Sequence, residues 1–218
     1  MSVLGAQLKI CGVTHPDDLD VCLAHRVPAV GLNLWSGSKR ALTFEQAAPL
    51  VQRARAGSGP SPTIVAVMVD PTEAEVHRAF DELAVDLVQP HGDAPIERYA
   101  QLGRPYAWVI RGTPELATLR APSPAPAWIL LDARVVGFGG QGVTTDWSWA
   151  ARAVSALRPV PVWLAGGITS DNAASALAQV RPAGLDVASG AERPDDPRRK
   201  DPAAIAALAS ICQNLSAP

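Results

Sequence analysis

Eight short apolar runs recur at fairly regular intervals along the 218-residue chain, and they restrict its possible folds more than any other feature. Several are almost continuously apolar, as expected of parallel strands covered on both faces. The eight predicted strands are Leu8–Cys11, Ala29–Leu34, Ile64–Val69, Asp86–Gln89, Ala107–Ile110, Trp128–Leu131, Val162–Leu164 and Leu185–Ala188.

The segments between these runs carry helical periodicity and helix-start signals. Thr43 and Thr72 each begin a capping-box pattern, and Thr14, Asp146 and the pair Ser170-Asp171 are the other predicted starts. Alternating strand and helix signals predict the α/β class. Eight repeats favour a single (β/α)8 TIM barrel, one domain over residues 1–218, above an open doubly wound sheet. No Gly-x-Gly-x-x-Gly motif follows the first run, which lowers the dinucleotide-binding alternative.

Composition excludes several classes of protein. Hydrophobic residues make up 48% and charged residues 18%, which is typical of a folded globular chain. A net charge of −2 gives no electrostatic reason to expect a nucleic acid or a membrane as partner. Three cysteines without metal-ligand spacing argue against a disulfide scaffold or a metal site. We therefore expect a cytoplasmic protein, either a monomer or a homodimer.

Two apolar runs near the C-terminus end in small residues: Ala165-Gly166-Gly167-Ile168 and Asp186-Val187-Ala188-Ser189-Gly190. Glycine lets backbone N–H groups approach an anion closely, and a following helix N-terminus adds partial positive charge. In a TIM barrel the loops after the last two strands are a frequent phosphate site. The pattern predicts a small phosphorylated ligand, although glycine turns of this kind also occur for purely structural reasons.

The carboxyl ends of the other predicted strands carry further polar groups. Lys9 and Cys11 lie two apart in a strand and so point to one face, where an ammonium would favour the thiolate and make Cys11 usable as a base or nucleophile. Packing as a small buried hydrophobe is the alternative for Cys11. Asp132 leaves an apolar run, and burial should raise its pKa as a general acid requires, unless it only caps the next loop.

Two more side chains fit a binding role. Arg40, in Ser38-Lys39-Arg40, is a candidate for holding a substrate carboxylate, or else a solvated surface arginine. His91 could donate to a substrate or titrate near neutrality, or it could only hydrogen-bond its own loop. The glycine-rich stretch 138–144 could be a lid or a plain surface turn, and Arg198-Arg199-Lys200-Asp201 is interpreted as a solvated turn before the last helix.

Taken in order, these motifs resemble one enzyme family. They are Lys9-Ile10-Cys11-Gly12-Val13-Thr14, Ser38-Lys39-Arg40, Gln89-x-His91-Gly92-Asp93, Leu130-Leu131-Asp132, Gly139-Gly140-x-Gly142-x-Thr144-x-Asp146-Trp147, Ala165-Gly166-Gly167-Ile168 with Asn172, Asp186-Val187-Ala188-Ser189-Gly190-Ala191-Glu192, and Lys200-Asp201. The ordered set is similar to phosphoribosylanthranilate isomerase of tryptophan biosynthesis and covers essentially the whole chain.

The resemblance implies an Amadori rearrangement of N-(5-phosphoribosyl)anthranilate to the corresponding 1-deoxyribulose 5-phosphate, without a metal or an organic cofactor. It implies Cys11 as general base, Asp132 as general acid and Arg40 as the residue that holds the anthranilate carboxylate. The predicted substrate-binding set is Lys9, Arg40, His91, Gly140, Gly166, Gly167, Asp186, Ser189 and Gly190.

Other readings stay open. Asn33, Gly37 and Pro90 depart from the usual family pattern, and the departures concern substrate detail more than reaction type. The histidine-pathway isomerase performs the same rearrangement, but that family resembles enzymes with a pair of aspartates as acid and base. Cys11 stands at the first of these positions, which counts against this alternative. A bifunctional enzyme that acts on both substrates, an aldolase-type lyase with a Schiff base on Lys9 and a catalytically silent barrel are the remaining alternatives.

Overall fold

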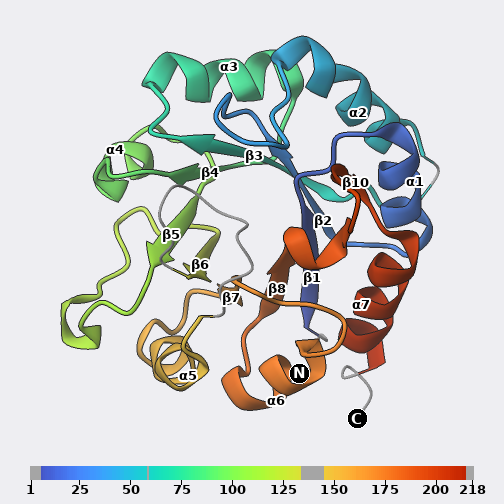
Figure 1. The fold of residues 1–218 in the computed structure, drawn as a ribbon. Coiled ribbons are helices and arrows are strands. Elements are labelled where there is room, and N and C mark those ends of the chain that lie inside the picture. The colour runs from blue at the N-terminus through green and yellow to red at the C-terminus, as the bar shows by residue number, and fades with distance from the viewer. Residues whose placement is uncertain (1–5, 58, 134–144, 215–218) are drawn as a thin grey trace.

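Eight parallel strands form a nearly closed barrel with the helices outside it, as the computed structural model shows (Figure 1). The structure describes residues 6–57, 59–133 and 145–214. The predicted TIM barrel is confirmed, and every predicted strand overlaps an observed one. The strands are β1 (Gln7–Cys11), β2 (Ala29–Asn33), β3 (Thr63–Val69), β4 (Leu87–His91), β5 (Ala107–Arg111), β6 (Trp128–Asp132), β7 (Val162–Leu164) and β8 (Gly184–Val187).

The helices follow the strands as expected, except after β5, where only a short 3-10 turn (Leu116–Thr118) is found among the described residues. Both predicted capping boxes are present, and Asp146 caps its helix by accepting from the Trp149 N–H. The helices are α1 (Pro16–Ala24), α2 (Phe44–Ala56), α3 (Glu73–Leu83), α4 (Ile96–Ala100), α5 (Trp147–Ala156), α6 (Ala173–Val180) and α7 (Pro202–Asn214).

Two predicted helix starts are wrong by one or two residues. The residue that caps α1 is His15, whose Nδ1 accepts from the Asp17 N–H, whereas the Thr14 hydroxyl donates to the carbonyl of Arg198. Helix α6 begins after Asn172, because Ser170-Asp171 forms a turn before it. In both cases a second hydrogen-bonding side chain stands beside the predicted cap.

The barrel has one seam, between β4 and β5. Around the rest of the ring the strands pair in the order β4-β3-β2-β1-β8-β7-β6-β5, whereas β4 and β5 share an isolated bridge between Val88 and Tyr106. The N–H of Val88 donates to the Pro105 carbonyl across this bridge. Two residues further along β4 the chain places Pro90, which has no N–H to continue the ladder. The departure noted at Pro90 therefore coincides with the opening of the sheet.

The barrel interior has its own small apolar cluster at the amino end of the strands. Trp128 and Trp163 stack there with ring centroids 4.9 Å apart. Gly184 on the neighbouring strand makes room for them, because a Cβ at this position would lie 2.8 Å from Cδ2 of Trp163. This plug fills the base of the barrel, so polar side chains gather at the opposite, carboxyl ends of the strands.

The segment after β8 departs most from the sequence prediction. A three-residue 3-10 turn (Ser189–Ala191) leads into an antiparallel hairpin of β9 (Glu192–Arg193) and β10 (Asp196–Lys200). The interpretation of residues 198–201 as a solvated turn is wrong, because Lys200 is 0% exposed and Arg199 forms an ion pair with the buried carboxylate of Asp18. The hairpin thus packs against α1 instead of standing in solvent (Figure 1).

Candidate active site

Lys9 and Asp186 form a buried ion pair inside the barrel. The β1–β8 register sets the two residues opposite each other, and Nζ of Lys9 lies 2.9 and 2.8 Å from the two carboxylate oxygens. Burial alone would lower the pKa of Lys9, but the charge and hydrogen bonds of Asp186, with the help of Cys11, raise it. Lys9 is therefore a protonated ammonium, and it and Asp186 satisfy each other directly.

Cys11 points to the same side of β1 as Lys9. Both side chains pack over Gly31 of β2, since a Cβ there would lie 2.9 Å from Sγ of Cys11 and 3.1 Å from Cε of Lys9. Burial raises the pKa of the Cys11 thiol, and the opposing effect of the Lys9 ammonium is smaller. Lys9 therefore favours the thiolate, as expected, but in the free protein burial outweighs this effect and the pKa of Cys11 is raised.

Asp132 ends β6, which β7 and β8 separate from β1 around the ring. Burial is the largest cause that raises its pKa to about 6, and the nearby charge of Asp186 adds to it. Its Oδ1 accepts one backbone hydrogen bond, from the Ala133 N–H at 2.9 Å. The pKa of Asp132 and that of Cys11 both respond to Lys9 and Asp186, so these four side chains belong to one electrostatic neighbourhood.

Arg40 is buried at the carboxyl end of the barrel, which excludes the solvated-surface alternative. Its Nε donates to Oε1 of Glu192, and its backbone N–H donates to the Ser38 hydroxyl at 3.1 Å. Gly12 has a φ of +74°, and a Cβ there would overlap Cδ of Arg40. Nη2 of Arg40 is buried and has no hydrogen-bond partner in the described structure. One edge of this guanidinium is thus available for a ligand.

Glu192 and Lys200 also belong to this region, although neither is among the predicted site residues. Glu192 follows the turn after β8, and its side chain is 8% exposed. Nζ of Lys200 donates to the carbonyl of Ala188 at 3.0 Å, and burial lowers the pKa of Lys200 to about 8. Both residues appear in the motifs that resemble the isomerase family, and this resemblance was the signal that could have identified them. The strands β9 and β10 that carry them are too short and polar to predict from apolar runs.

His91 ends β4 and lies beside Gln89. Nε2 of Gln89 and Nε2 of His91 are 3.0 Å apart, while Nδ1 of His91 is buried without a partner among the described residues. Burial, followed by the charges of Lys9 and Arg111, lowers the pKa of His91 to about 3. The expectation that His91 titrates near neutrality is wrong, and the ring is a neutral hydrogen-bonding group.

The two glycine turns predicted to bind phosphate meet in space. Gly166 and Gly167 both have positive φ values, +86° and +65°. A Cβ at Gly190 would overlap the carbonyl oxygen of Ile168, so the turn after β8 rests directly on the turn after β7. Asn172 holds the first turn by donating to the Gly167 carbonyl at 2.8 Å and accepting from the Thr169 N–H. Ser189 opens the second turn.

The second of these turns differs from the expectation that a helix N-terminus follows it. The turn after β8 is followed by three residues of 3-10 helix and a hairpin, so no long helix begins there. Gly140, with the rest of the glycine-rich stretch 138–144, lies outside the described residues.

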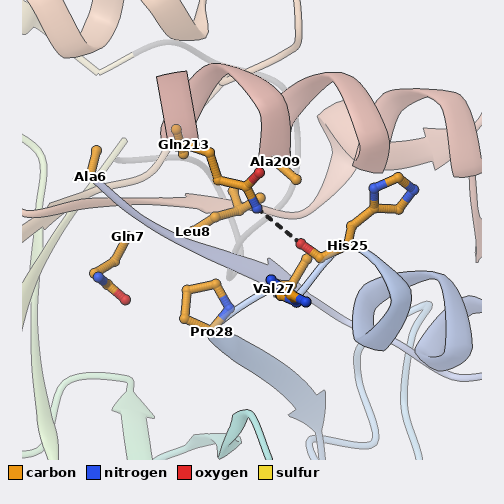
Figure 2. Close-up of a pocket in the computed structure, with 10 residues that line it drawn as sticks. Ala6, Gln7, Leu8, His25, Val27, Pro28, Ala209 and Gln213 are labelled. Carbon is orange, nitrogen blue, oxygen red and sulfur yellow. Dashed lines mark hydrogen bonds between the residues drawn. The ribbon is translucent and has the colours of Figure 1, made fainter. Parts of the chain in front are cut away.

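A pocket of about 230 Å³ opens at the opposite end of the barrel, between the start of β1 and α7 (Figure 2). Gln213 crosses it and donates from Nε2 to the His25 carbonyl at 3.1 Å. None of the predicted site residues lines it.

Over the described ranges, no group of three His, Cys, Asp or Glu side chains could hold a metal ion. Within the same ranges, no helix combines the length and the apolar character that crossing a membrane requires.

Comparison with known proteins agrees with this geometry. The sequence model of the family described as N-(5'phosphoribosyl)anthranilate (PRA) isomerase matches residues 8–209. The N-(5'-phosphoribosyl)anthranilate isomerase of Chromohalobacter salexigens is 37% identical over 215 residues, which is 97% of this chain and 96% of the relative. The enzyme of Ralstonia nicotianae is 33% identical over 197 residues, 85% of this chain and 84% of the relative.

Solved structures give the same result. Phosphoribosyl anthranilate isomerase from Thermus thermophilus superposes with a TM-score of 0.81 at 29% identity, over 96% of this chain and 99% of that one. A phosphoribosyl anthranilate isomerase in complex with reduced 1-(o-carboxyphenylamino)-1-deoxyribulose 5-phosphate gives a TM-score of 0.78 at 25% identity, with the same coverage. The chain therefore belongs to the N-(5'-phosphoribosyl)anthranilate isomerase family, enzymes of tryptophan biosynthesis.

Proposed function

We propose that this isomerase rearranges N-(5'-phosphoribosyl)anthranilate to 1-(2-carboxyphenylamino)-1-deoxyribulose 5-phosphate with Cys11 as general base and Asp132 as general acid. One observation carries the assignment. The two groups end strands that are separated by β7 and β8 around one barrel, and the same buried Lys9–Asp186 pair influences the pKa of both. One acid and one base on two sides of a bound sugar is the arrangement that this rearrangement requires.

In the first step the Asp132 carboxyl donates its proton to the furanose ring oxygen. The C1–O bond breaks, and the nitrogen lone pair forms a C1–N double bond, which gives a protonated Schiff base. A pKa of about 6 keeps a fraction of Asp132 protonated at neutral pH, as a general acid needs.

In the second step the Cys11 thiolate removes the proton from C2. The electrons of the C2–H bond form a C1–C2 double bond, those of the C1–N double bond return to nitrogen, and the resulting enolamine tautomerises to the ketone. The Lys9 ammonium favours the thiolate against the effect of burial, so we assign Lys9 a supporting electrostatic role in this step.

Binding follows from the groups around these two residues. We assign Arg40 to the anthranilate carboxylate, because its buried Nη2 lacks a partner in the described structure. The backbone of Gly166, Gly167, Ser189 and Gly190 is assigned to the phosphate, since the two turns touch. His91 is assigned to substrate binding as a neutral group, and Lys9, Asp186 and Gly140 complete the proposed set.

The test is a fluorescence assay that follows consumption of N-(5'-phosphoribosyl)anthranilate. Cys11→Ala and Asp132→Asn should each lower turnover by at least about 10²-fold, the usual contribution of an acid or base. Cys212→Ala, which changes a buried thiol on α7, is the matched control and should retain turnover. A Cys11→Ala or Asp132→Asn variant that works at the wild-type rate would remove that residue from the mechanism.

The aldolase-type alternative is disfavoured by the state of Lys9. A Schiff-base lysine must be an unprotonated, accessible amine, whereas Lys9 is fully buried, ion-paired and has a raised pKa. Borohydride treatment in the presence of a keto-acid phosphate should therefore leave Lys9 unlabelled.

A further inference from the structure

Glu192 is a buried carboxylate surrounded by cationic side chains. Oε1 accepts from Nε of Arg40 and lies 3.7 Å from Nζ of Lys200, while Oε2 lies 3.3 Å from Nζ of Lys39. Lys39 and Arg40 come from the loop after β2, whereas Lys200 pairs with Glu192 across the β9–β10 hairpin, so Glu192 connects the loop after β2 to the hairpin that follows β8. None of the proposed chemical steps uses this carboxylate.

The contact between Glu192 and Arg40 fixes the direction of the guanidinium. A guanidinium is planar, so a bond at Nε determines where the opposite nitrogens point. The backbone of Gly12 packs against Cδ of the same side chain, because a Cβ at residue 12 would overlap this atom. With Nε engaged, the buried Nη2 is left without a partner in the described structure.

We propose that Glu192 is a positioning residue, which holds Arg40 through Nε so that the unpartnered Nη2 is presented to the carboxylate of the substrate. The inference rests on the binding role proposed above for Arg40 and adds the residue that makes this role possible.

The local charge supports the assignment. Burial would raise the pKa of Glu192, but the hydrogen bond and charge of Arg40, followed by the charges of Lys200 and Lys39, lower it, so the carboxylate stays ionised. One anion then faces three cationic side chains. The remaining positive charge favours a second carboxylate, which the substrate can supply.

A double-mutant cycle tests the inference. The probe is reduced 1-(o-carboxyphenylamino)-1-deoxyribulose 5-phosphate, with inorganic phosphate as a second probe that lacks the carboxylate. Glu192→Ala should weaken binding of the reduced analogue about tenfold, the size of a coupling between contacting residues. In an Arg40→Ala background the same change should no longer weaken it. Affinity for inorganic phosphate should change less than about twofold throughout.

Kinetics should show the same division. If Arg40 holds the carboxylate equally in substrate and transition state, Glu192→Ala should raise KM and leave kcat within about twofold. Glu45→Ala, an exposed glutamate at the start of α2, is the matched control and should change neither constant. Should Glu192→Ala fail to fold by circular dichroism, Glu192→Met replaces it in the cycle, because its side chain has a similar length but cannot accept from Nε of Arg40. Glu192→Gln, whose amide oxygen can still accept, should retain the affinity.

The outcomes separate the two proposals. Equal weakening by Glu192→Ala in both backgrounds, or parallel loss of inorganic phosphate binding, would overturn the positioning role. Failure of the wild-type protein to consume N-(5'-phosphoribosyl)anthranilate would instead overturn the proposed function.

Discussion

The side chain of Arg40 occupies the space that a Cβ at Gly12 would need, so only glycine fits at this position. The backbone at Gly12 has a φ of +74°, and any Cβ there would overlap Cδ of Arg40. A residue of the first strand loop thus determines where a guanidinium of the second strand loop can lie. The spacing of motifs in the sequence does not predict this contact, and the first prediction follows from it.

Gly12→Ala should displace Arg40 and weaken substrate binding in addition to straining the backbone. We expect KM to rise about tenfold, and the free energy of unfolding to fall by about 1–3 kcal/mol because of the positive φ. Steady-state kinetics and urea unfolding measure the two effects.

Gly103→Ala is the matched control for that variant. Gly103 also has a positive φ, +65°, but nothing lies within 4 Å of a Cβ built on it. It should lose stability without a change in KM. If both variants raise KM alike, the overlap with Arg40 is not the cause.

The pH profile of kcat/KM should reveal the titration of Asp132. The reactive form needs a thiolate at Cys11 and a protonated Asp132, but the pKa of the carboxyl, about 6, lies below the raised pKa of the thiol. Between the two pKa values this form is a small and constant fraction. We therefore expect kcat/KM to rise up to about pH 6, stay level, and fall once the thiol has ionised.

Asp132→Asn removes the titrating carboxyl, so its low residual kcat/KM should continue to rise with pH above 6 as the thiol ionises. The substrate phosphate also titrates near pH 6, and it is common to both proteins. A level region that begins at pH 6 in Asp132→Asn as well would assign that limb to the phosphate and contradict the assignment to Asp132.

The Lys9–Asp186 pair should behave as a buried unit in stability measurements. Lys9→Met leaves the Asp186 carboxylate buried without its partner and should lower the free energy of unfolding by about 3–5 kcal/mol. The double variant Lys9→Met/Asp186→Leu should be more stable than Lys9→Met alone, because no unpaired charge remains. Urea unfolding of both variants near neutral pH measures this.

Arg53→Met provides the comparison for that experiment. Its ion pair with Asp20 lies at the surface, where both side chains are about half exposed, and its loss should cost under about 1 kcal/mol. Additive losses from Lys9→Met and Asp186→Leu would show that the two buried charges act independently.

Much of the fold could be predicted because parallel strands are apolar along their whole length. The run Val162–Leu164 matches β7 to the residue, and the capping boxes at Thr43 and Thr72 mark two helices correctly. The β9–β10 hairpin could not be predicted in this way. Its residues are polar, and it is held by long-range partners such as Asp18, 182 residues away from Lys200.

In the candidate site, the positions of the residues could be predicted from the sequence, whereas their protonation states could not. The positions of Cys11 and Asp132 at strand ends, and of Arg40 in the loop after the second strand, follow from the order of apolar runs. Their protonation does not, because burial decides whether the Lys9 ammonium or desolvation dominates the pKa of the Cys11 thiol. His91 shows the same limit, since its neutral state depends on burial.

The seam between β4 and β5 gives the last prediction, which concerns Pro90. The Val88 N–H already bonds across this seam, and parallel pairing would direct an N–H at position 90 to the Ala107 carbonyl. Pro90→Val supplies that donor with a side chain of similar size. We expect the new amide at position 90 to be protected from hydrogen exchange, and the small pocket of about 90 Å³ lined by Pro90, Trp108 and Arg111 to shrink.

The free energy of unfolding should gain about 1 kcal/mol from the new hydrogen bond but lose some of it, because the unfolded chain without the proline is freer. Amide exchange is therefore the better measurement. Pro105→Ala, a proline change just before β5 that retains the accepting carbonyl, should leave the pocket as it is. Exchange at position 90 as fast as in an unfolded peptide would mean that the missing donor does not cause the opening of the barrel.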